Sequence, residues 1–240
     1  MNDQVAHLVD KAWDRFQQTP EDHRFMIAIG GIPGSGKTTL SQIVTQALNA
    51  RHASLHPEAQ DSVPVAAFVP MDGYHLTRAQ LSAMPDPTTA HARRGAEFTF
   101  DGAAFLSLVQ ALRTPLTASS TTIFAPSFDH AVKDPRENDI AVHPGHRIVV
   151  FEGNYVVLDK EPWREAAALM DECWFVEVDF EVARRRLVAR HVRAGIAGDE
   201  EEAGRRADGN DLVNGRQIVE NRVRVHEVVV SRDDEMWRHE

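Results

Sequence analysis

The chain has 240 residues, is 42% hydrophobic and carries a formal net charge of −10. This length fits one large domain or a domain with a small appendage, and the apolar fraction is enough for a sizeable core. No apolar run approaches the ~20 residues that cross a bilayer, and the acidic amino terminus has no signal-peptide pattern. We therefore expect a cytoplasmic protein that does not bind membranes.

Charge and cysteine content exclude several further classes. A general nucleic-acid-binding protein needs a basic face, which a net charge of −10 argues against. The single cysteine, Cys173, excludes an intrachain disulfide and a Cys-rich zinc site, and it favours a reducing compartment. His52 and His56 have the spacing of helical metal ligands, but no acidic or Cys partner stands beside them, so a polar loop is the preferred interpretation.

Apolar residues recur at helical spacing near the amino terminus, at Val5, Leu8, Val9, Ala12, Trp13 and Phe16. This periodicity predicts an amphipathic helix within residues 1–20 that docks on the rest of the chain. The segment "TPEDHR" ends it, and a second unit spans residues 24–240.

Strand and helix patterns alternate through this second unit. Buried strands are predicted over 25–29, 63–69, 147–153, 173–179 and 226–231, and helices over 38–49, 100–113, 161–170, 180–195 and 212–223. Residues 121–128 and 139–145 are expected to be short extended pieces, 52–62 and 84–98 loops, and 198–211 a mobile charged segment. The alternation predicts a doubly wound α/β fold, with a mostly parallel sheet covered by helices on both faces.

The segment "GIPGSGKT", residues 31–38, matches G-x-x-x-x-G-K-[ST] at every fixed position. A buried strand precedes it and a helix follows, which is the context of the P-loop of NTPases. Its backbone amides and the helix dipole would cradle phosphate oxygens, Lys37 would reach the β and γ phosphates, and Thr38 would bind Mg²⁺. The expected nucleotide-binding residues are Gly31, Pro33, Gly34, Ser35, Gly36, Lys37, Thr38 and Thr39.

Two carboxylates follow predicted strands, Asp72 in "MDGYHL" and Glu152 in "FEGNY". The carboxyl ends of parallel strands share one edge of a sheet, so both acids are expected near the γ-phosphate. One can hold Mg²⁺ and the other can accept a proton from an attacking alcohol. The alternatives are a turn residue before Gly73 for Asp72, and a capping or loop carboxylate for Glu152.

The chain resembles the uridine kinase/phosphoribulokinase/pantothenate kinase superfamily of P-loop kinases. It looks most similar to the pantothenate-kinase-like group, with its nucleoside or fructose-transport kinases and a fungal kinase-like branch. The resemblance covers roughly residues 24–230 and rests on "GIPGSGKTTL", "PMDGYHL", "RRGAEFTFD", "APSFDHAVKDP", "VVFEGNYVVLD", "RRRLVARHVRAG" and "DGNDLVNGRQIVENR".

The resemblance implies roles for matching positions. Asp72 would contact the acceptor hydroxyl as general base, and Glu152 would act on the water shell of Mg²⁺. Asp129 and His130 would face the acceptor, although Phe128 replaces a tyrosine of the relatives, so the acceptor need not be uridine. A turn between two extended pieces is the alternative for this segment.

A basic helix supplies further candidates. Arg186, Arg190 and Arg193 share one helical face by spacing. By resemblance this helix opens a helical lid over about 184–210, in which Arg186 and Arg190 stabilise the transferring phosphoryl group. A solvated basic stripe is the alternative.

The remaining acceptor candidates are weaker. Arg94, beside Arg93, would clamp a negatively charged acceptor or belong to an exposed loop. Tyr74, His75 and Tyr155 are either acceptor contacts or ordinary packing. Asp101 is expected to cap a helix.

We therefore expect a small-molecule kinase that uses ATP and Mg²⁺ to phosphorylate a hydroxyl of a nucleoside, a sugar, pantothenate or glycerate. The alternative is a nucleotide-dependent regulatory ATPase that acts through a protein partner. Neither the acceptor nor a preference for ATP over GTP follows from the sequence, and a homodimer is left open.

Overall fold

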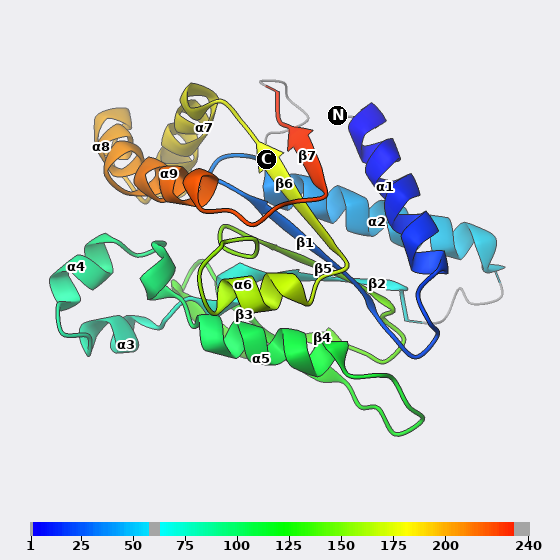
Figure 1. Ribbon diagram of the computed structural model, residues 1–240. Coiled ribbons are helices and arrows are strands. Elements are labelled where there is room, and N and C mark those ends of the chain that lie inside the picture. Colours follow the sequence, from blue (N-terminus) through cyan, green and yellow to red (C-terminus); the bar gives the residue numbers. More distant parts are fainter. Residues whose placement is uncertain (1, 58–62, 233–240) are drawn as a thin grey trace.

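A computed structural model describes residues 2–57 and 63–232. Among these residues, five parallel strands form one sheet in the order β2-β5-β1-β6-β7, and an antiparallel hairpin forms a second, two-stranded sheet (Figure 1). The strands are β1 (Phe25–Gly31), β2 (Ala66–Pro70), β3 (Ile123–Asp129), β4 (Asp134–Val142), β5 (Ile148–Gly153), β6 (Glu172–Glu177) and β7 (Glu227–Val230). The predicted α/β fold is confirmed.

Helices connect the strands and cover both faces of the large sheet (Figure 1). They are α1 (Asn2–Gln17), α2 (Lys37–Leu55), α3 (Arg78–Ser82), α4 (Pro87–Ala92), α5 (Gly102–Arg113), α6 (Trp163–Ala168), α7 (Phe180–Arg193), α8 (Glu200–Arg206) and α9 (Leu212–Glu220). Short 3₁₀ turns span Met71–Tyr74 and Glu97–Thr99, and a π-helical segment spans Ala207–Asp211. Within the described part of the chain, no helix combines the length and apolar character needed to cross a bilayer.

The alternation of side chains along each strand divides the core into two layers. On β1, Met26 and Ala28 join the cluster under α5, α6 and α7, whereas Ile27 and Ile29 join the cluster under α1 and α2. The same alternation runs along β5. Successive strand residues point to opposite faces, so these uniformly apolar strands require a helical layer on each side.

The predicted amino-terminal helix docks on the domain. Leu8, Val9, Ala12 and Trp13 of α1 are buried against α2 and the sheet. The helix is also anchored by charge, because the fully buried carboxylate of Glu172 accepts hydrogen bonds from Arg15 and from the indole of Trp174, at 2.7 and 2.9 Å.

Two segments that were predicted as loops contain helix. Helix α2 continues through His52 to Leu55, where a loop was expected; residues 58–62 lie outside the described residues. The rings of His52 and His56 lie 4.6 Å apart, and the described residues contain no cluster of three metal-ligating side chains. The expected loop at 84–98 contains α4, which Asp86 caps and Pro87 begins.

The charged segment at 198–211 is helical rather than irregular. Asp199 accepts a hydrogen bond from the Glu202 amide as the N-cap of α8, and three glutamates occupy the first turn. Negative side chains at a helix amino terminus are favoured by the helix dipole. Arg184 of α7 holds the end of this segment through a bidentate ion pair with Asp208, at 2.7 and 2.9 Å.

We predict that Glu172→Gln destabilises the protein by about 3 kcal/mol, the low end of the cost of breaking a buried ion pair, because its partners Lys11 and Arg15 are partly exposed. The free energy of unfolding from urea titration measures the loss. A matched control is Glu201→Gln, which removes an exposed pair with Arg205 and should change stability by less than about 0.5 kcal/mol. Equal effects of the two substitutions would contradict the anchoring role of Glu172.

Candidate functional site

The loop between β1 and α2 forms a cradle of backbone amides at the carboxyl end of β1. Gly34 and Gly36 have φ angles of 80° and 86°, in the left-handed region that favours glycine. A Cβ on Gly34 would lie 2.8 Å from the carbonyl oxygen of Ala183, so α7 packs directly on the loop. Ser35 Oγ and Thr39 Oγ1 are buried with no hydrogen-bond partner among the described residues. Such unpaired polar groups at a helix amino terminus fit phosphate oxygens.

Lys37 begins α2 and points into the site. Its ammonium nitrogen lies 3.5 Å from the carbonyl oxygen of Ile32 and 3.8 Å from Glu152 Oε1, and its side chain is only 11% exposed. Burial lowers the pKa of Lys37, and the nearby carboxylates of Glu152 and Asp72 oppose that shift. The lysine is therefore a largely desolvated cation, which a negatively charged ligand would stabilise.

Glu152 stands at the end of β5, in register with Ile29 of β1 and Pro70 of β2. Its carboxylate accepts a hydrogen bond of 3.1 Å from the hydroxyl of Thr38. Burial raises the pKa of Glu152 to about 7, although Lys37 pulls it down. The hydroxyl of Thr38 and the carboxylate of Glu152 are hard oxygen ligands of the kind that Mg²⁺ takes together with phosphate oxygens, so this pair fits the cation predicted from the sequence.

Asp72 follows β2 in a 3₁₀ turn, and its side chain is half exposed. The register of β2 with β5 places this turn beside Glu152. Burial is the main cause of the raised pKa of Glu152; the negative charge of Asp72 also raises this pKa, whereas the positive charge of Lys37 lowers it. The Nδ1 atom of His75 lies 2.8 Å from the backbone oxygen of Asp72, and burial lowers the pKa of His75. A Cβ on Gly73 would lie 2.0 Å from the carbonyl oxygen of Pro126, which fixes this turn against β3.

Helix α7 lies over the phosphate cradle, but its arginines have different environments. Arg186 donates to the backbone oxygen of Gly34 at 3.2 Å and to Ser231 Oγ at 2.8 Å, so it ties the P-loop to the end of the sheet. Arg186 therefore supports the P-loop in this structure, whereas the sequence predicted that it contacts the transferring phosphoryl group. Arg190 is exposed on α7, and its charge influences the pKa values of Lys37, Glu152 and Asp211.

The two predicted acceptor tyrosines belong to the core. Tyr155 is fully buried and its hydroxyl donates to the backbone oxygen of Gly95 at 2.8 Å. Tyr74 is buried edge-on against Phe105, with ring centroids 5.3 Å apart. Burial raises the pKa of both phenols. The packing alternative therefore describes Tyr74 and Tyr155 better than a contact with an acceptor.

The segment after β3 is a hairpin turn. The carboxylate of Asp129 accepts hydrogen bonds from the amides of Ala131 and Val132, at 2.8 and 2.9 Å, and these bonds lower its pKa. His130 is exposed, with its ring against Phe128. Phe128 also contacts His75, at 4.8 Å between ring centroids, and His75 Nδ1 lies 4.0 Å from Asp72 Oδ1.

Arg94 is neutralised inside the protein. It donates to Asp134 at 3.0 Å and to the backbone oxygens of Leu76 and Lys133, and its guanidinium lies over the ring of Phe128. Its side chain is 15% exposed. These contacts describe a structural arginine that holds the segment after β2 to the hairpin, rather than an arginine that is available to clamp an acceptor.

Sequence reasoning did not select three polar residues of the π-helical segment and α9. Asn210, Asp211 and Asn214 are largely buried among the apolar residues of this segment. Burial raises the pKa of Asp211, against the charges of Arg190, Arg206 and Lys37. Polar side chains four residues apart within an apolar helical pattern are the signal that would have found Asn210 and Asn214. Single-turn π segments are frequent at functional sites.

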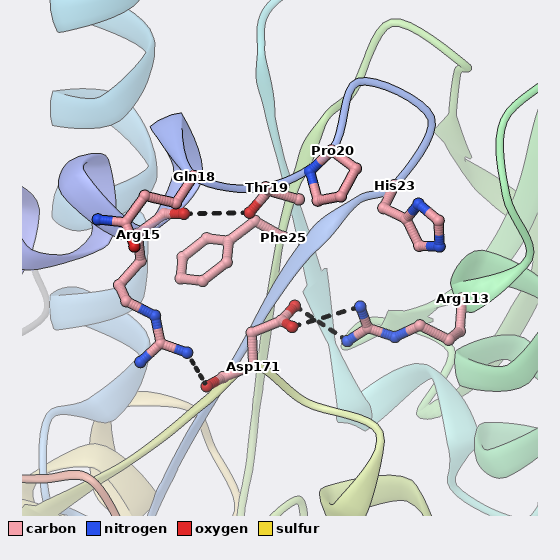
Figure 2. Close-up of a pocket in the computed structure, with 8 residues that line it drawn as sticks. All are labelled: Arg15, Gln18, Thr19, Pro20, His23, Phe25, Arg113 and Asp171. Carbon is pink, nitrogen blue, oxygen red and sulfur yellow. Dashed lines mark hydrogen bonds and ion pairs between the residues drawn. The ribbon is translucent and has the colours of Figure 1, made fainter.

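A separate pocket of about 300 Å³ lies at the opposite edge of the sheet. Figure 2 shows Asp171 facing Arg113, with Arg15 and His23 on either side of Phe25. Arg113 donates to Asp171 at 2.9 Å and Arg15 donates to the Asp171 backbone oxygen at 3.3 Å, so these polar groups bind one another. Open parallel sheets bind ligands beyond the carboxyl ends of their strands, which assigns the functional site to the P-loop edge.

Comparisons with known proteins agree with this geometry. No protein-family model matches the chain. Over 159 residues the chain is 60% identical to an ATP-dependent kinase-like protein of Aspergillus versicolor, a match that covers 66% of this chain and 92% of the relative. Over 200 residues it is 40% identical to a Schizosaccharomyces pombe protein named for uridine kinase, a match that covers 83% of this chain and 80% of the relative.

Solved structures give the same result. The crystal structure of YFH7 from Saccharomyces cerevisiae matches with a TM-score of 0.85 and 25% identity, over 96% of this chain and 99% of that one. A Silicibacter protein named for a fructose transport system kinase matches with a TM-score of 0.78 and 32% identity, over 93% and 98%. Identity at this level over most of both chains establishes the family: the chain belongs to the uridine kinase/phosphoribulokinase/pantothenate kinase superfamily of P-loop kinases.

Proposed function

We propose that this kinase transfers the γ-phosphoryl group of ATP, chelated by Mg²⁺, to a hydroxyl group of a small polar metabolite. The observation that carries the proposal is the grouping of Lys37, Glu152 and Asp72 where β1, β5 and β2 end. One buried cation between two carboxylates of different exposure matches the needs of phosphoryl transfer, which are positioning, charge neutralisation and a base. The relatives named as ATP-dependent kinases support ATP as the donor.

The nucleotide side of the site is built by the P-loop. ATP with Mg²⁺ supplies the phosphoryl group and a divalent charge that neutralises its oxygens. The amides of the loop and Lys37 would bind the phosphates, and Ser35 and Thr39 would gain the partners that their buried hydroxyls lack. Thr38 and Glu152 would hold the cation, directly or through water.

The acceptor side is built by the turn after β2. Asp72 has the half-exposed carboxylate of the pair, so it is the one that an acceptor hydroxyl can reach. It would take the hydroxyl proton as the acceptor oxygen forms its bond to the γ-phosphorus of ATP and the bond from that phosphorus to the bridging oxygen breaks, which releases ADP. Arg190 would stabilise the negative charge that develops during transfer, and α7 would exclude water that competes with the alcohol.

We predict that Asp72→Asn lowers acceptor-stimulated ADP release by about 10²–10⁴-fold, the usual contribution of a general base. Nucleotide affinity should change little, because Asp72 is not part of the phosphate cradle. Turnover is measured with a panel of uridine, fructose, D-glycerate and pantothenate, and affinity by calorimetry with AMP-PNP and Mg²⁺.

Asp129→Asn is the matched control, because the amide oxygen still accepts the turn hydrogen bonds, and its turnover should stay within about twofold of wild type. Unchanged stimulated turnover in Asp72→Asn would remove Asp72 from the mechanism. A wild-type protein that no hydroxylated compound stimulates would contradict the kinase proposal and favour the regulatory ATPase.

We predict a pH dependence of stability from Glu152. Its folded-state pKa, about 7, lies above its ordinary value of 4.5, so the folded protein binds more protons than the unfolded chain between these values. The stabilising contribution of the protonated carboxyl is complete below about pH 4.5 and is lost as pH rises through about 7.

Glu152→Gln removes this titration. Without nucleotide, the variant should gain stability relative to wild type between pH 5 and pH 8 by roughly 1–3 kcal/mol, which urea titrations at both pH values measure. Glu201→Gln, at an exposed site, should show no such gain. A constant difference between Glu152→Gln and wild type across this range would show that the carboxyl of Glu152 does not titrate there.

A further inference from the structure

Arg93 carries a positive charge that the protein holds with neutral partners. It stands at the end of α4, half-buried, where its Nε donates to Asn210 Oδ1 at 2.9 Å and its Nη2 to Asn214 Oδ1 at 2.8 Å. Both acceptors are amide oxygens, and the structure records no ion pair between Arg93 and a carboxylate of the described residues. The guanidinium is therefore fixed in position while its full charge is kept.

Three arginines of the neighbouring segments are compensated by carboxylates. Arg94 and Arg78 share the carboxylate of Asp134, at 3.0 and 3.4 Å. Arg184 binds Asp208 at 2.7 Å. Arg93 thus differs from its sequence neighbour, because amide groups orient it without cancelling its charge.

The two asparagines leave one edge of the guanidinium open. They occupy the side formed by Nε and Nη2, and the opposite edge, formed by Nη1 and the second hydrogen of Nη2, has no recorded partner in the described chain. The Arg93 side chain is only half-buried, and neither recorded hydrogen bond of its guanidinium involves Nη1. A planar edge of two N–H groups matches the two oxygens of a carboxylate or phosphate.

The segment of Arg93 is tied to two other parts of the chain near the strand ends. It is held to the segment that follows β5 through the hydrogen bond from Tyr155 to Gly95, and to the π-helical segment through the hydrogen bond from Asn210 Nδ2 to the Arg94 carbonyl, at 3.0 Å. Figure 1 shows α4 facing α8 and α9 across this side of the sheet. Asp211, next to Asn210, is close enough to act on Lys37.

We infer that Arg93 binds an anionic group of the acceptor, a carboxylate or a phosphate, through its open edge, with Asn210 and Asn214 as the residues that orient it. The inference rests on the proposed function and narrows the acceptor to an anionic polar metabolite. Asp72 would then receive the hydroxyl end of the acceptor and Arg93 its charged end.

Binding measurements test this independently of turnover. The full chain is saturated with AMP-PNP and Mg²⁺, so that the phosphate cradle is filled, and is titrated by calorimetry with inorganic phosphate, D-glycerate and pantothenate. The uncharged partners glycerol and pantothenol are titrated in parallel. We expect at least one of the three anions to bind, and D-glycerate or pantothenate to bind at least tenfold more tightly than its uncharged partner.

Three variants assign the binding to Arg93. Arg93→Met should weaken anion binding about tenfold or more, the usual effect of losing a charge-assisted contact. Asn214→Asp keeps the side-chain shape but puts a carboxylate on the guanidinium, so it should weaken anion binding while the fold is kept. Arg78→Met removes a cation of the same segment that Asp134 already neutralises, and it should bind the anion as wild type does.

The inference is overturned if none of these anions binds the wild type, or if Arg93→Met and Asn214→Asp bind them as tightly as wild type. It is also overturned if Arg93→Met weakens AMP-PNP instead, because the arginine would then serve the nucleotide. Undiminished phosphorylation of uridine or fructose by Arg93→Met would refute an anionic acceptor and leave the kinase proposal standing. Absence of stimulation by any hydroxylated compound would instead count against the kinase proposal itself.

Discussion

The buried pair of Lys37 and Glu152 is the interaction on which the rest of the site depends. Their charged groups lie 3.8 Å apart, with side chains only 11% and 7% exposed. Burial lowers the pKa of Lys37 and raises the pKa of Glu152, so it favours the neutral form of each group. A pair this dry is a weak source of stability, since the desolvation of both charges opposes their attraction. Its arrangement is better explained by ligands that bring further charge, phosphates for the lysine and a divalent cation for the carboxylate.

The parallel sheet is what makes this pair, because the register of its strands sets which residues meet. Glu152 lies opposite Ile29 of β1 and Pro70 of β2, so the last residues of three neighbouring strands end at one level. The P-loop leaves β1 there and the Asp72 turn leaves β2 there. Helix α7 then closes the top, where Ala183 touches Gly34. The polar residues of the candidate site therefore follow the apolar parts of the strands. A shift of one residue in the register of β5 would turn the side chain of Glu152 toward the other face of the sheet.

The sequence predicted the parts of the site that depend on local chemistry. The glycine pattern between a buried strand and a helix predicted the loop that follows β1. The acids after two predicted strands, Asp72 two residues past "AAFVP" and Glu152 directly after "IVVF", were predicted to share one edge of the sheet, and they do. Asp101, predicted as a cap, accepts a hydrogen bond from the Ala104 amide at the start of α5. The sheet order and the hairpin's separation from the large sheet could not be predicted this way, because they depend on which strands pair over long distances.

The residues for which the sequence left two interpretations open are those whose environment depends on a distant partner. Tyr155 is a polar-tipped aromatic after a strand in either interpretation, and only the position of Gly95 shows that its hydroxyl is already used. Arg93 and Arg94 are identical and adjacent in sequence. Asp134 compensates Arg94 from 40 residues away, whereas Asn210 and Asn214 orient Arg93 from more than 110 residues away. Neither the pairing of Arg94 with Asp134 nor the contacts of Arg93 with the two asparagines can be inferred from composition or residue spacing.

This distribution of compensated and uncompensated cations explains how a chain of net charge −10 can serve anionic ligands. Several lysines and arginines away from the strand ends are paired with carboxylates, as in Lys11 with Glu172 and Arg184 with Asp208. At the strand ends, the two carboxylates near Lys37 are expected to bind a cation and an alcohol instead of the lysine. The recorded hydrogen-bond partners of Arg93 are the side-chain amides of Asn210 and Asn214. Positive charge in a low-dielectric cleft attracts anions more strongly than the same charge spread over a surface. An acidic exterior with a few unneutralised cations at the strand ends would therefore favour the binding of an anionic ligand at this edge of the sheet.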